Sequence, residues 1–176
     1  MQFMLMPVGY AQEVAAETPA VAATTEPVEP HDPLGRYTPR GSLQGFLQSA
    51  DDKDFIKAVE YLDLRNLPNR YRNAQPTQFA EMLAVVIERE IWIDFEELSD
   101  SPEGALGDGL PDYRDELARI AGNDKDYILL LQHVPDGKGG RIWKVSNETV
   151  AKIADLYSQF GYGPIAQVIA DTLPDV

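Results

Sequence analysis

The chain has 176 residues, of which 44% are hydrophobic, and its 29 acidic and 15 basic side chains give a formal net charge of -14. This size and composition predict one folded domain with its own apolar core. The acidic surface excludes nucleic acids as partners, because like charges repel phosphates. The absence of cysteine excludes disulfides, thiolate zinc sites and cysteine nucleophiles.

The first 37 residues show neither helical nor strand periodicity. Residues 1–11 are apolar and end in small residues before Gln12, the pattern of a truncated secretory signal peptide, with an arbitrary start or a flexible tail as the alternative. Residues 12–37 are rich in Ala, Pro, Thr and Glu, which predicts a disordered acidic linker in which His31 is solvated. We therefore assign residues 38–176 to a single α+β domain.

Two amphipathic helices are predicted next, joined as an antiparallel helical hairpin. Thr38 caps the first and Pro39 opens it, while Asp51 or Asp52 caps the second. Their apolar positions recur at helical spacing and are expected in the core rather than in a partner groove. These positions are Leu43, Phe46, Leu47 and Ala50 in the first helix and Phe55, Ile56, Val59 and Leu62 in the second.

A basic cluster separates this hairpin from a third helix. Arg65, Arg70 and Arg72 form the cluster, which either pairs with the acidic stretch that follows or is simply solvated. Pro76 opens the third helix. Its broad apolar face consists of Phe79, Met82, Leu83, Val86 and Ile87.

Residues 91–117 form an acidic, glycine-rich stretch that could be a metal site, a spacer or an ordered loop. Alternating apolar side chains predict a short strand over residues 91–95, with Trp92 on its opposite face. Turn residues then predict an ordered loop pinned to the core by Leu106 and Leu110. Calcium is the chemical alternative, but the spacing does not match an EF-hand. Its candidate oxygen ligands are Asp94, Glu96, Glu97, Asp100, Glu103, Asp108 and Asp112.

Three β-favouring runs follow, "DELARIAG", "KDYILLLQHV" and "RIWKV", and they predict an antiparallel meander. The last hairpin is expected to turn at Asp136-Gly137 and Gly139-Gly140. A further helix begins after the cap Ser146 and stops at Gly161, with an apolar face made of Val150, Ile153, Ala154 and Tyr157. A last short segment is expected to start at Pro164.

The sequence offers no constellation for bond chemistry. His133, near the last hairpin, has no GxSxG serine to complete a hydrolytic triad. Glu96 and Glu97 are neighbours in sequence, and we interpret them as a run of surface charge. A glycosidase would need a cleft that holds two carboxylates at the required separation. We predict a non-enzyme with no catalytic, cofactor-binding or metal residues. A small-molecule-binding or isomerase-like α+β module is the alternative. A deep apolar cavity with His133 or a carboxylate pointing into it would favour this alternative.

Several phrases, in order, resemble one family of bacterial membrane proteins. They are "TPRGSLQGFL", "AVEYLDLRNLP", "IWIDFEELSDSPEG" with "DGLPDYRDEL", and "GRIWKVSNETVAKIADLYSQFGYGPI". Together they are similar to the soluble N-terminal region of mechanosensitive ion channel proteins of the small-conductance type. The resemblance implies a signal peptide, a linker, this exported domain, and then transmembrane helices and a channel module.

The expected function is therefore an extracytoplasmic accessory or sensing domain of a mechanosensitive-type channel. It would modulate assembly or gating through protein contacts, with the rest of the channel or a second copy of itself as partner. The resemblance implies a periplasmic location, attached to the inner membrane through the full-length protein. No run of about eighteen apolar residues is present, so this segment itself is not expected to insert into a bilayer.

Overall fold

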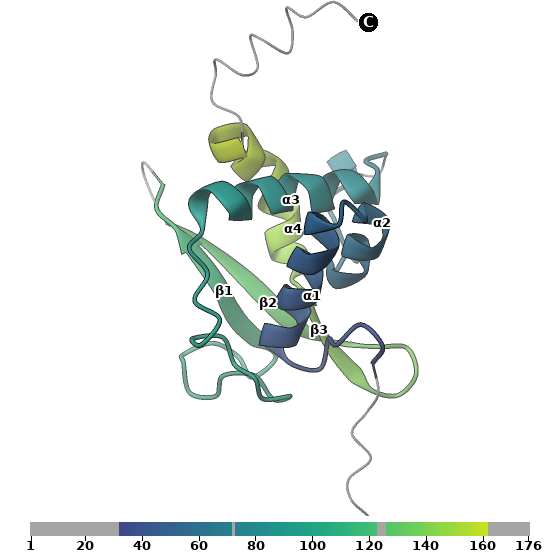
Figure 1. Cartoon of the computed structure of the whole chain (residues 1–176), viewed down its shortest axis with the longest axis vertical. Coiled ribbons are helices and arrows are strands. Elements are labelled where there is room, and N and C mark those ends of the chain that lie inside the picture. Colours follow the sequence, from purple (N-terminus) through teal and green to yellow (C-terminus); the bar gives the residue numbers. More distant parts are fainter. Residues whose placement is uncertain (1–31, 72, 123–125, 162–176) are drawn as a thin grey trace, which may run out of the picture.

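The structure, a computed structural model, describes residues 32–71, 73–122 and 126–161. Helices form one layer and a small antiparallel sheet lies against them, which confirms the predicted α+β class (Figure 1). The helical elements are α1 (Pro39–Asp51), α2 (Phe55–Ala58), α3 (Pro76–Glu90) and α4 (Asn147–Leu156), with 3-10 turns at Val59–Tyr61 and Asn69–Tyr71 and a π-helical turn at Tyr157–Gly161. The strands are β1 (Arg114–Ile120), β2 (Tyr127–Pro135) and β3 (Arg141–Val145).

Helix α1 begins as predicted, since the Thr38 side chain accepts from the backbone N–H of Gly41 and Pro39 takes the first turn. The start of α2 was predicted wrongly. Asp54, not Asp51 or Asp52, caps it by accepting from the N–H of Lys57 at 3.0 Å. After one turn the chain tightens into a 3-10 turn, so a period of 3.6 residues does not hold. Ile56 is consequently 80% exposed instead of facing the core.

Helix α3 begins at Pro76 as predicted. Before it, the two described members of the basic cluster have partners outside the acidic stretch. Arg65 contacts Asp63 at 2.7 Å, and Arg70 lies 3.6 Å from Asp155 of α4. Arg72 lies outside the described residues.

The meander was predicted correctly, because all three strands form where the β-favouring runs lie. The strand order is β1-β2-β3, and both pairs are antiparallel. The β2–β3 hairpin closes through Asp136, whose N–H donates to the carbonyl of Gly140 at 3.1 Å. A bulge between Glu116 and Ala118 shifts the register of β1 against β2.

Helix α4 follows β3 directly. Ser146 caps it by accepting from the N–H of Thr149, as predicted. The hydroxyl of Thr149 also accepts from the N–H of Leu130 at 2.8 Å and donates to its carbonyl at 3.2 Å, so α4 continues the hydrogen bonding beside β2 after β3 ends. A π-helical turn extends the helix to Gly161. The segment predicted from Pro164 onward lies outside the described residues.

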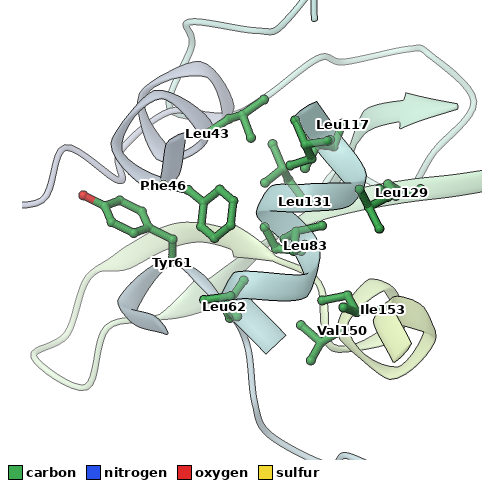
Figure 2. Close-up of a cluster of buried hydrophobic side chains, with 14 of the residues drawn as sticks. Leu43, Phe46, Tyr61, Leu62, Leu83, Leu117, Leu129, Leu131, Val150 and Ile153 are labelled. Carbon is green, nitrogen blue, oxygen red and sulfur yellow. The ribbon is translucent and has the colours of Figure 1, made fainter. Parts of the chain in front are cut away.

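The core lies between the helical layer and one face of the sheet. Figure 2 shows leucine, phenylalanine and tyrosine side chains from α1, α3, β2 and the segment after α2 converging on it. Its largest fully buried members are Trp143, Tyr61, Phe46, Leu43, Leu62, Leu83, Leu129, Leu131, Ile153 and Leu156.

The ordered part begins earlier than composition predicted. Residues 32–37 were assigned to a disordered linker, yet Arg36 binds the Asp32 carboxylate at 2.9 Å and its carbonyl accepts from the N–H of Trp143 at 2.7 Å. Leu34 packs on the core. These contacts hold the segment, and composition could not anticipate the bond to Trp143 because that residue is distant in sequence. The signal-like residues 1–11, the linker residues up to 31 and His31 lie outside the described part of the chain.

A candidate docking groove at the open edge of the sheet

The acidic stretch begins with a segment that was predicted as a strand and is not one. Residues 91–94 are irregular and pair with no strand among the described residues. The carboxylate of Asp94 accepts from the N–H of Glu96 at 2.9 Å, and its carbonyl accepts from the N–H of Glu97 at 3.2 Å. This turn ends the extended run before a ladder can form. Trp92, within the run, is 95% exposed.

The loop that follows is ordered, as predicted, but other residues anchor it. Leu98 is buried, and the guanidinium of Arg40 donates twice to its carbonyl, at 3.0 and 3.1 Å. The N–H of Arg40 also donates to the carbonyl of Ser99 at 3.1 Å, which ties the loop to the first turn of α1. Leu106 is 65% exposed and does not reach the core. The prediction failed because the turn carries Leu106 outward, a direction that residue type does not encode.

Trp143 of β3 is the central anchor of this loop, and sequence reasoning gave it no role. Its side chain is fully buried, and its indole N–H donates to the carbonyl of Pro102 at 2.9 Å. The outer edge of the indole lies against Gly104, where an added Cβ would approach the ring to 2.7 Å. Gly104 also has a φ of +80°, so glycine is required there twice over. The only sequence signal for this role of Trp143 was that it is the single aromatic residue in a short predicted strand next to a hairpin.

His133 packs against the anchor of this loop. Its ring stacks on Trp143 with centroids 4.8 Å apart and an interplanar angle of 3°. Burial and the nearby charge of Arg141 lower the pKa of His133, with Glu103 acting in the opposite direction. His133 also lies outside the lining of the acidic groove between β1 and the chain that leaves α3, which is described next.

A groove of about 440 Å³ separates β1 from the chain that leaves α3. Its floor includes five consecutive residues of β1, from Asp115 to Arg119. Successive side chains of a strand point to opposite faces, so a cavity bordered by all five lies along the strand edge rather than over one face. The other wall is formed by residues 90–94, Glu97 and Leu98, with Ala105 and Asp108 closing one end. Figure 1 shows this chain running beside β1, on the side away from β2.

The groove is strongly negative. Among the described residues that line it, six are carboxylates and one is a cation, Arg119, which is paired with Glu116 at 2.9 Å. The six are Glu90, Asp94, Glu97, Asp108, Asp115 and Glu116.

Asp115 is the most buried of these carboxylates. It is only 4% exposed and accepts from the N–H of Ala105 at 3.1 Å, but forms no ion pair with any described Lys or Arg. Burial raises its pKa, and the backbone hydrogen bond from Ala105 opposes that shift. A carboxylate has about four lone-pair sites, so Asp115 retains capacity for a further donor.

The geometry does not assemble the calcium ligands considered above. Among the described residues, no three His, Asp or Glu side chains are grouped closely enough to hold a metal ion. The carboxylates are instead spread along the groove and the outer loop.

Within the described parts of the chain, every helix is too short or too polar to cross a bilayer. Comparisons with protein-family models, with curated proteins and with solved structures find no match to this chain.

Proposed function

We propose that this domain is a non-enzymatic accessory and sensing domain that docks a protein segment in its acidic groove. Following the sequence resemblance, we place it in a mechanosensitive-type channel protein of small conductance, outside the cytoplasm and attached to the inner membrane. It would modulate assembly or gating through contacts made at this groove.

The observation that carries the proposal is Trp92. A tryptophan side chain that is 95% exposed gives up the stabilisation that burial provides, about 1.5–3 kcal/mol for a large apolar side chain. Trp92 also lines the acidic groove, so an exposed tryptophan stands beside a group of six carboxylates. Tryptophan is enriched among the residues that dominate the energy of protein interfaces. This combination supports a docking site.

The distribution of charge supports a cationic partner. Carboxylates in a partly enclosed groove focus the field and accelerate encounter with a positive ligand. A second copy of the chain would present the same negative groove, so self-association through this surface alone is opposed by repulsion. A basic segment of the channel protein is therefore the better occupant.

An apolar core bordered by an acidic groove also favours docking over a small-molecule module. Most of the buried apolar side chains form one contiguous cluster, and the groove borders it at Leu98 and Leu117, with carboxylates among its other lining residues. His133, the expected acid–base group of such a module, is engaged with Trp143.

The test is site-specific photo-crosslinking in the native envelope, with the photoreactive residue at position 92 and a control at position 56 on α2. Both sites are exposed, but only Trp92 lines the groove. We expect position 92 to capture a segment of a channel-type membrane protein, either continuous with this chain or separate from it. Capture of the same products from both positions, or of no membrane protein, would overturn the proposal. Patch-clamp recording of an Asp94→Lys variant adds a functional readout, an altered tension threshold.

A further inference from the structure

We infer that the partner binds as an extended, basic segment that lies in the groove and pairs its backbone with the open edge of β1. This inference rests on the proposed docking function and specifies its mode. The partner would become a fourth strand of the sheet, a recognised way in which sheet edges bind peptides.

The length and direction of the groove match a strand. Five consecutive residues of β1 border it, which corresponds to about 16 Å of extended chain. Apart from β2, no strand among the described residues pairs with β1. The unpaired backbone groups of an edge strand are a template for another chain.

The opposite wall begins in an extended conformation at Ile91. Ile91 has φ and ψ of -119° and 115°, an extended conformation, and residues 91–95 alternate apolar side chains. This wall lies across the groove from β1 and forms no ladder with it. An inserted segment would therefore lie between β1 and the irregular chain that leaves α3.

The charge of the groove requires the inserted segment to be basic. Asp115 is buried without a cation, and the strand-edge position of β1 brings the inserted side chains past it. A lysine or arginine of the partner would supply the missing counter-charge, and a charge-assisted hydrogen bond is about twice as strong as a neutral one. Trp92 at the rim can cover the aliphatic part of such a side chain or contact its cation through the ring face.

The first experiment uses the whole chain and a synthetic peptide of about eight alternating lysine and valine residues, long enough to cover this edge. Binding is measured by titration calorimetry at low salt. Two further peptides have N-methyl groups on alternate backbone nitrogens, one on the odd and one on the even positions, so each blocks hydrogen bonding along one edge. We expect at least one of them to bind about tenfold more weakly than the parent peptide, because it loses several backbone hydrogen bonds.

Protein variants test whether the peptide binds in the groove, whereas the methylated peptides test whether it pairs as a strand. Asp115→Asn is expected to weaken binding of the parent peptide by about tenfold, the loss typical of one charge-assisted contact. Asp51→Asn is the matched control, because Asp51 is exposed, lies outside the groove and changes the net charge equally.

If both methylated peptides bind as tightly as the parent, strand pairing is wrong while docking in the groove stands. If the two aspartate variants bind alike, the groove is not the site and the proposed function fails with it. The same conclusion follows if the parent peptide does not bind at low salt.

Discussion

The two outer edges of the sheet are treated in opposite ways. At β3, Leu62 forms a parallel bridge with Val145, and the N–H of Asp63 donates to the carbonyl of Val145 at 2.9 Å. The hydroxyl of Ser42 donates to the carbonyl of Trp143 at 2.8 Å, and the N–H of Trp143 donates to Arg36. At β1, a groove takes the place of such contacts.

The difference shows how an edge can remain open without aggregating. Carboxylates surround the β1 edge, and their negative charge discourages pairing with another copy of this acidic chain. The same carboxylates admit a basic chain. The open edge is therefore selective, whereas the closed edge is structural.

The largest expected difference between the two edges concerns the two tryptophans. Replacing the fully buried Trp143 with alanine should cost about 3–5 kcal/mol of unfolding free energy, because it leaves a large cavity and frees the 101–105 loop. Trp92→Ala should change stability by about 0.5 kcal/mol or less, since its side chain is exposed. Urea unfolding followed by circular dichroism measures both. Equal costs would show that Trp92 is packed and that the groove is not as described.

A smaller effect is expected at the glycine under Trp143. Gly104→Ala should cost about 1–3 kcal/mol through overpacking against the ring, in addition to backbone strain. Gly107→Ala is the control, because its φ of +81° is nearly the same but no atom lies within 4 Å of the added Cβ. The difference between the two urea midpoints isolates the packing of the loop on Trp143. Identical midpoints would contradict that packing.

The closed edge should be sensitive to the loss of one hydroxyl. Ser42 is 1% exposed, and its hydroxyl donates to the carbonyl of Trp143. Ser42→Ala should cost about 1–2 kcal/mol, because a buried carbonyl loses its donor. The exposed Ser158 offers a neutral Ser→Ala control. A stability equal to that of the Ser158→Ala variant would show that this contact does not hold the edge.

The smallest effects are expected in the pH dependence of stability, to which two buried aspartates contribute with opposite signs. At Asp63, burial acts to raise the pKa, but hydrogen bonds from Arg65 and Gln132 outweigh it and the pKa lies below its ordinary value of 3.8. Its contribution to stability is present above pH 3.8 and is lost as the pH falls through the lowered pKa. At Asp115, burial raises the pKa above 3.8, so its contribution is present below pH 3.8 and is lost as the pH rises through the raised pKa.

Urea unfolding of the two Asn variants from pH 3 to pH 7 tests these signs. Relative to the parent chain, Asp63→Asn should become less stable as the pH rises from about 3, because the parent gains an ionised, paired carboxylate. Asp115→Asn should become relatively more stable as the pH rises, because the variant avoids burying an unpaired charge. Parallel pH profiles for the two variants would contradict the contrast.

Local signals predicted much of the fold, and long-range contacts decided the rest. Thr38, Pro39 and Ser146 mark helix starts by chemistry that acts within one turn, so they were predictable. The alternation over residues 91–95 indicated a strand, but a ladder needs a neighbour at the right distance and the Asp94 turn ends the run first. The prediction that Leu106 anchors the loop was wrong, and the anchoring role of Trp143 was not predicted, for one reason. Which side chain meets a loop depends on contacts far apart in sequence.

The most direct test of the central claim is amide hydrogen exchange, resolved by NMR, in the free protein and with the lysine–valine peptide. In the free protein, outward-facing amides of β1 between Glu116 and Arg119 should exchange faster than the Trp143 amide, which is bonded to Arg36 on the closed edge. Saturating peptide should protect those β1 amides and leave Trp143 unchanged. The account is contradicted if the β1 amides are already as protected as Trp143, or if bound peptide leaves their exchange unaltered.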